Sequence, residues 1–148
     1  MCTLRSDPVE RVTHQVHGLP DLAQEHPEVY AYFREQTTRM VKEYGVDGLR
    51  IDAVRHMPQS VFQRLHRDWQ DDLGAPVQTI AEIFEGDAQA LTAMWTEGGY
   101  STAFNFPLHY ALVDTYCKGT HPGRLASTLD TTQRLRPTGW INFIDNHD

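Results

Sequence analysis

The sequence predicts an α/β fold in which a parallel sheet is covered by helices. Three observations support this prediction: short β-branched runs recur along the chain, amphipathic helical segments separate them, and glycines follow several of those segments. Strands that alternate with helices are joined by right-handed crossovers, which make them parallel. Two architectures fit, an open doubly wound sheet and part of a (β/α)8 TIM barrel.

The first predicted helix covers residues 27–44. Pro27 suits a first helical position, apolar residues follow at helical spacing, and Gly45 ends the helix. The residues expected on its apolar face are Val29, Tyr32, Phe33, Met40, Val41 and Tyr44. Residues 1–26 have no such period, so they are expected to form a loop segment before this helix, with the α/β domain over residues 27–148.

Strand and helix patterns then alternate to the end of the chain. Gly74 ends one apolar helical stripe, Asp87 is the expected N-cap of another, and Gly98-Gly99 closes the latter. The expected strands lie within residues 46–54, 77–84, 100–106 and 140–147, and the expected helices within 61–73, 88–98, 108–116 and 125–135.

Composition excludes several classes of protein. The formal net charge is -7 and the basic residues are scattered, so a nucleic-acid partner is not expected. No apolar run is long enough to span a membrane, and no signal peptide is visible, which leaves localisation open. Cys2 and Cys117 are the only cysteines, which excludes a disulfide scaffold and leaves open one bridge or two free thiols.

Polar side chains lie where the predicted strands end. They are Arg50 and Asp52, Glu82, Asn105, and His147 with Asp148. In both candidate architectures the carboxyl ends of parallel strands form the ligand-binding edge of the sheet. The functional site is therefore expected there.

Two of these carboxyl groups are expected to have opposite pKa shifts. Arg50 and Asp52 are two residues apart on one strand, so they share a face and the guanidinium should keep Asp52 ionised. Glu82 lies between Ala81 and Ile83 in an apolar run, where burial should raise its pKa. An ionised nucleophile beside a protonated acid, about 5 Å apart, is what a retaining glycosidase needs.

The same residues fit other interpretations. Arg50 and Asp52 alone could be a structural ion pair, and Asp, Glu and His at strand ends could bind a cation in a metal-dependent hydrolase. The spacing of possible metal ligands does not decide for a metal-dependent hydrolase, because His14 and His17 are a lone pair and no His-Glu-x-x-His motif occurs. No glycine-rich phosphate loop follows any strand.

Five short motifs occur in order along residues 18–148: LPDL at 19–22, GLRIDAVRH at 48–56, AEIFEGD at 81–87, FNFPLHYAL at 104–112 and FIDNHD at 143–148. GLRIDAVRH, AEIFEGD and FIDNHD resemble three ordered signature regions of the α-amylase superfamily of glycoside hydrolases. LPDL resembles the shorter motif that precedes them, and FNFPLHYAL is similar to the family's stretch after the sixth barrel strand. The resemblance implies that Asp52 is the nucleophile, Glu82 the general acid/base and Asp148 the third carboxylate, which grips sugar hydroxyls. Arg50 would then position the nucleophile, and His147 would bind the sugar at the cleavage subsite.

The resemblance also implies roles for Arg55, His56 and Asp21. Arg55 and His56 occupy the positions that often contact the leaving-group side of the substrate as Lys-His; here Arg replaces Lys. Asp21 and the carbonyl of His56 match ligands of a structural calcium, whose other ligands would come from an earlier segment. Asp21 could equally cap the helix that begins near Pro27.

By the resemblance, the four strands would be strands four to seven of a (β/α)8 barrel, which typically needs about 250 residues. We therefore expect a fragment of an enzyme that acts on α-glucosidic bonds of starch-like or maltooligosaccharide substrates, inactive as an isolated chain. Its open sheet edges are expected to promote self-association. A non-catalytic homologue that binds or assembles is the alternative, although Asp52, Glu82 and Asp148 are all present.

Overall fold

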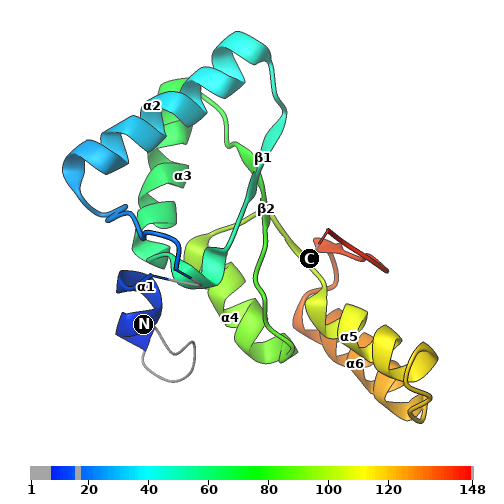
Figure 1. Cartoon of the computed structure of the whole chain (residues 1–148). Helices are drawn as coiled ribbons and strands as arrows, with labels where there is room; N and C mark the ends of the chain where they lie inside the picture. Colours follow the sequence, from blue (N-terminus) through cyan, green and yellow to red (C-terminus); the bar gives the residue numbers. More distant parts are fainter. Residues whose placement is uncertain (1–7, 16–17, 148) are drawn as a thin grey trace.

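The computed structural model describes residues 8–15 and 18–147 and contains a four-stranded parallel sheet (Figure 1). The strands are β1 (Gly48–Ile51), β2 (Gln78–Ala81), β3 (Thr102–Phe104) and β4 (Trp140–Ile141). Gly48 opposes Gln78 in the register, where an added Cβ would lie 2.7 Å from the Gln78 carbonyl oxygen. A glycine is therefore needed for the first contact between β1 and β2.

The order of the strands is β1-β2-β3-β4, the order in which they occur along the chain. In a doubly wound sheet the order reverses at a switch point, whereas in a (β/α)8 barrel each strand is added on the same side of its predecessor. Right-handed crossovers then place the connecting helices on one face. The strand order therefore selects the partial barrel from the two architectures that the sequence left open.

The predicted helices are present. The helical elements are α1 (Pro8–Thr13), α2 (Pro27–Tyr44), η1 (Val54–His56), α3 (Gln59–Leu73), α4 (Ala88–Gly98), α5 (Phe106–Tyr116) and α6 (Gly123–Leu135). The prediction of an unbroken loop over residues 1–26 was wrong at α1, because six residues are too few to show an apolar period. The short 3-10 helix η1 was not predicted either.

The strands are shorter than the apolar runs that predicted them. Residues 140–147 were expected to form one strand, but only Trp140 and Ile141 pair with β3, which is itself three residues long. Phe143 instead stacks on the ring of His109 and packs edge-on against Phe106. An apolar run indicates that its side chains are buried, but it does not show whether the segment pairs as a strand. Here the packing of rings buries Phe143 without strand pairing.

The core lies between the sheet and α3 and α4. Its largest fully buried side chains are Trp69, Trp95, Phe106, Ile83 and Leu91. Burying a large side chain of this kind stabilises the fold by about 1.5–3 kcal/mol. The core thus packs Ile83, which follows Glu82 at the end of β2, in one cluster with side chains of α3 and α4.

Helix α2 differs from the sequence prediction in the face that it buries. Tyr30 is 3% exposed, whereas Tyr32, Met40 and Tyr44 from the expected apolar face are 60%, 45% and 68% exposed. Helix α2 packs beside α3, so only one side of it is covered (Figure 1). Helical spacing shows which residues share a face, but the packing partner determines which face is covered.

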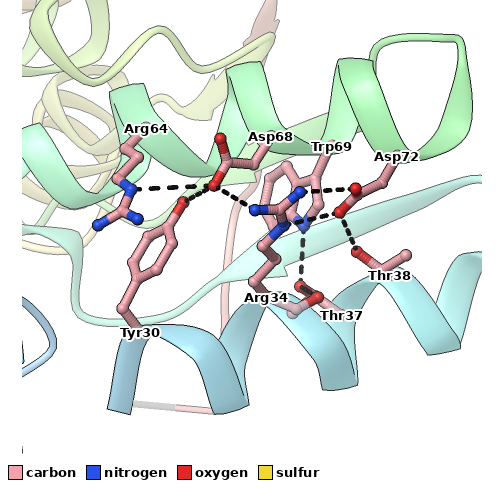
Figure 2. A network of polar contacts seen from close by, with 8 residues as sticks. All are labelled: Tyr30, Arg34, Thr37, Thr38, Arg64, Asp68, Trp69 and Asp72. Atoms are coloured by element: carbon pink, nitrogen blue, oxygen red, sulfur yellow. Dashed lines mark hydrogen bonds and ion pairs between the residues drawn. The ribbon is translucent and has the colours of Figure 1, made fainter. Parts of the chain in front are cut away.

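A polar network joins α2 to α3 around the buried ring of Trp69 (Figure 2). Arg34 pairs with both Asp68 and Asp72, and the hydroxyl of Tyr30 donates to Asp68 over 2.6 Å. The indole N–H of Trp69 donates to the hydroxyl of Thr37 over 2.8 Å. Helix α2 is therefore fastened to α3 by ion pairs and hydrogen bonds as well as by apolar packing.

No helix within the described part of the chain is long and apolar enough to cross a membrane.

Candidate active site

The candidate site begins at a tight turn that follows β1. Ala53 adopts a left-handed conformation, with φ 47° and ψ 36°, which costs an L-residue about 1–2 kcal/mol. Its backbone N–H donates to the Glu82 carboxylate over 3.0 Å, and the N–H of Val54 donates to the Glu82 carbonyl over 3.1 Å. The strained turn thus wraps the end of β1 around Glu82 and leaves the Asp52 side chain 71% exposed.

Arg50 lies between the two carboxylates. One guanidinium nitrogen donates to Asp52 over 2.6 Å, and another forms an ion pair with Glu82. The Glu82 side chain is 7% exposed and the Arg50 side chain 36% exposed. Residues 32 positions apart in the sequence are therefore brought together because β1 and β2 are neighbouring parallel strands.

The two carboxyl groups have pKa shifts of opposite sign, as the sequence predicts. Hydrogen bonding with Glu82 is the largest cause and lowers the pKa of Asp52; burial, the next largest, raises it, and Arg50 and His147 lower it further. Burial is the largest cause that raises the pKa of Glu82; the hydrogen bond from Ala53 opposes it. The pair therefore favours an ionised Asp52 beside a Glu82 that retains its proton to higher pH.

The carboxyl pair opens into a cavity of about 950 Å³. The predicted site residues that line it are Asp21, Arg50, Asp52, Arg55, His56, Glu82 and His147. Phe84 also lines it, is 39% exposed, and has its ring centroid 4.3 Å from that of Phe106. The cavity therefore combines charged groups with an exposed aromatic face.

Asn105, which also follows a strand, lies away from the cavity. The side chain of Asn105 accepts from the N–H of Leu108 over 3.1 Å and donates to Asn142 over 2.9 Å, so it caps α5. It is 2% exposed and does not line the cavity. Asp148 lies outside the described residues, so its predicted role stays a prediction.

Sequence reasoning missed three contributors to the site: Ala53, Phe84 and Glu85. The left-handed turn at Ala53 has no signal in the sequence, because alanine rarely adopts that conformation. Phe84 looked like part of an apolar strand, and Glu85 like a loop residue. The ion pair from Arg55 to Glu85, at 3.3 Å, is a contact that only the tertiary structure reveals.

The assignment of Asp21 and His56 as calcium ligands stays a prediction. Asp21 and His56 line the same cavity, but the described residues contain no group of three or more His, Cys, Asp or Glu side chains that could hold a metal ion. These two residues do not by themselves meet the six to eight oxygen ligands that calcium takes. The alternative role of Asp21 as the cap of α2 was wrong, because His26 occupies that position.

Curated α-amylases are similar in sequence to most of this chain. The α-amylase of Geobacillus stearothermophilus is 31% identical over 129 residues, which are 86% of this chain and 24% of that protein. The α-amylase of Bacillus licheniformis is 29% identical over 133 residues, 86% of this chain and 25% of that protein. No family model matches the chain.

Solved structures of related enzymes have the same fold. The α-amylase of Geobacillus thermoleovorans, solved with acarbose, has a TM-score of 0.79 at 27% identity, covering 96% of this chain and 32% of that chain. The γ-CGTase of alkalophilic Bacillus clarkii has a TM-score of 0.84 at 29% identity, covering 97% of this chain and 22% of that chain. The chain is similar in sequence and in fold to members of the α-amylase superfamily of glycoside hydrolases. It spans about a quarter of the length of the curated superfamily members that it matches.

Proposed function

We propose that this chain carries the nucleophile and the general acid/base of a retaining glycoside hydrolase or transglycosidase that acts on α-glucosidic bonds of starch-like or maltooligosaccharide substrates. The observation that carries the proposal is the position of Arg50 between Asp52 and Glu82, whose pKa values are shifted in opposite directions. A paired ionised nucleophile and protonated acid is the requirement of retaining glycoside hydrolysis.

In the proposed mechanism, an Asp52 oxygen attacks the anomeric carbon while Glu82 donates its proton to the departing glycosidic oxygen. The bond between the anomeric carbon and that oxygen breaks, and a glycosyl ester forms on Asp52. Glu82 then removes a proton from water or a sugar hydroxyl, which attacks the anomeric carbon and releases Asp52. Two inversions at one carbon retain the configuration.

The surroundings of the pair support binding of a sugar. The cavity offers the exposed face of Phe84, and aromatic faces supply apolar contact area with a defined geometry. His147 lines the cavity near Asp52, in keeping with its proposed place at the cleavage subsite; His56 and Arg55 are proposed on the leaving-group side. Asp148 is proposed to grip sugar hydroxyls.

A structural calcium remains a proposal that needs ligands besides Asp21 and the His56 carbonyl. It has no part in the proposed chemical steps, because the proton transfers are assigned to Glu82 and the covalent step to Asp52. Chelation is therefore expected to affect the stability of a complete enzyme rather than its choice of nucleophile.

The proposal is tested by completing the barrel. We expect the 148-residue chain alone to turn over maltooligosaccharides little. A chimera in which the chain replaces the matching segment of the Geobacillus stearothermophilus α-amylase is expected to cleave them with retention. NMR of the first anomer released measures the stereochemistry. In the chimera, Asp52→Asn is expected to abolish turnover, and Glu82→Gln to reduce it by about 10²- to 10⁴-fold.

Two results would contradict the proposed function, and a third would overturn a separate expectation. A chimera with native circular dichroism that binds acarbose but does not turn over substrate would favour a non-catalytic homologue. Activity that a chelator removes and a transition metal restores would favour a metal-dependent hydrolase. Robust turnover by the isolated chain, lost in Asp52→Asn, would overturn the expectation that the barrel must be completed.

A further inference from the structure

Arg55 reaches from η1 to the loop that follows Glu82. One guanidinium N–H donates to the carbonyl of Phe84 over 2.8 Å, and a second nitrogen pairs with the Glu85 carboxylate at 3.3 Å. The Arg55 and Glu85 side chains are 32% and 20% exposed, so the pair is partly shielded from water. Both contacts are made by one planar guanidinium, whereas a lysine would offer a single nitrogen.

The other oxygen of Glu85 binds the backbone of the residue that caps α4. It accepts the backbone N–H of Asp87 over 3.1 Å, and the Asp87 side chain in turn accepts the N–H groups of Gln89 and Ala90 over 2.8 and 2.9 Å. The N–H of Glu85 itself donates to the carbonyl of Ile83 over 2.8 Å. The loop from Ile83 to Asp87 is thus folded around the Glu85 carboxylate, which Arg55 holds.

The same two segments also meet on the other side of Glu82. Ala53 and Val54 donate their N–H groups to the carboxylate and the carbonyl of Glu82. Arg55, the next residue along the chain, binds the loop two and three residues beyond Glu82. The segment 53–55 therefore binds both Glu82 itself and the loop that follows it.

We propose that Arg55 is a positioning residue, which together with Glu85 forms a brace that holds the Glu82 loop against the Asp52 turn and keeps water from the Glu82 carboxyl group. This role differs from the direct contact with the leaving-group sugar that the sequence motif predicts for Arg55. The significance of the brace for catalysis rests on the proposed function; the brace itself is a property of the folded chain.

The test follows the side-chain carboxyl carbon of Glu82 by NMR in the ¹³C-labelled 148-residue chain, with Glu82→Gln used to assign the signal. The charged groups that face Glu82 are Arg50 and Asp52, and both stay unchanged. Arg55→Met removes a cation, and loss of a nearby positive charge by itself can only raise the pKa of a carboxyl group. Loosening of the loop instead hydrates Glu82 and lowers its pKa.

We expect Arg55→Met to lower the pKa of Glu82 toward its usual range and to speed exchange of the hydrogen-bonded amides of Glu85 and Asp87 by about tenfold, because local opening becomes easier. Arg55→Lys can replace only one of the two contacts and is expected to fall between Arg55→Met and the unmodified chain. Arg134→Met, which removes the exposed ion pair with Asp130, is the matched control and should change neither signal.

An unchanged or raised pKa of Glu82 in Arg55→Met, with unchanged exchange of the Glu85 and Asp87 amides, would overturn the brace. Glu85→Gln provides a second route, because it removes the ion pair and keeps a side-chain oxygen for Asp87; the pKa of Glu82 should fall by less. Because these measurements need no turnover, an inactive chimera with an intact brace would count against the proposed function alone.

Discussion

At the residue scale, Glu82 lies in an environment that favours the protonated carboxyl group needed for its proposed role over the charged carboxylate. Its side chain is 7% exposed and burial raises its pKa, while Arg50 and the N–H of Ala53 support the ionised form. Burial is the largest of these effects, so the folded chain binds a proton at Glu82 more tightly than the unfolded chain does. A functional site of this kind is expected to reduce stability.

Replacing Glu82 by Gln should therefore stabilise the chain in a pH-dependent way. The pKa of Glu82 is higher in the folded chain than in the unfolded chain, so its negative charge lowers the free energy of unfolding. This loss is fully present above the pKa of the folded chain and vanishes below the pKa of the unfolded chain, about 4.3. Glu82→Gln should raise Tm at pH 7 and lose this advantage as the pH is lowered to 4. Calorimetry across that range measures the effect, with exposed Glu25→Gln as the control; a Tm that falls equally at every pH would refute it.

At the scale of elements, α2 depends on its network with α3. Arg34 makes hydrogen bonds of 2.8 and 2.6 Å to the two oxygens of Asp72, and the Arg64 guanidinium lies 3.8 Å from the ring centroid of Tyr30 (Figure 2). Exposed single ion pairs contribute little, but a two-pronged Arg–carboxylate contact within a network contributes more. The position of α2 is thus sensitive to the charge of Asp72.

The network predicts a loss of stability in acid. Hydrogen bonding to Arg34 is the largest cause that lowers the pKa of Asp72 in the folded chain. A lowered folded pKa gives a contribution that is present above the unfolded pKa of about 3.9 and is lost as the pH falls through the folded value.

Asp72→Asn should accordingly lower Tm at pH 7, and the difference from the unmodified chain should shrink as the pH approaches 3. Thermal unfolding of the two proteins at matched ionic strength measures this. Asp130→Asn, at an exposed pair within α6, should have little effect at any pH. A Tm difference for Asp72→Asn that does not change with pH would show that its charge is not involved.

At the scale of the whole molecule, β1 and β4 are the outer strands of the sheet. Within the described part of the chain, β1 pairs only with β2 and β4 only with β3. Apolar side chains are exposed near β1, including Tyr44 at 68% and Val46 at 37%. An edge strand with unpaired N–H and C=O groups beside apolar surface is a template for pairing with another chain.

We expect this edge to cause self-association that rises with protein concentration. Val46→Lys places a charge beside β1, where it should oppose edge-to-edge pairing and lower the apparent mass in sedimentation velocity. Leu129→Lys, at a 46% exposed position on α6, is the control for a general gain in solubility. A chain that sediments as a monomer at every concentration would contradict the role of the edge.

The extent of sequence-based prediction differs between elements and contacts. The helix and strand segments from residue 27 onward were found because burial imposes a period on apolar residues, and Asp87 was found because it precedes a helical stripe. The ends of the strands were not predicted correctly, because β4 ends at Ile141 and the packing of rings replaces strand pairing beyond it. The Ala53 turn and the Arg55–Glu85 pair depend on contacts between segments, which no local pattern records.

The sequence by itself determined the α/β alternation, the pairing of Arg50 with Asp52 and the burial of Glu82, because each follows from spacing within one segment. The tertiary structure alone decided that Arg50 reaches both carboxylates, that Ala53 forms a left-handed turn, and that Arg55 binds the Glu82 loop. The physical reason is that strand order and loop contacts are set by packing between distant segments, which a one-dimensional period does not encode.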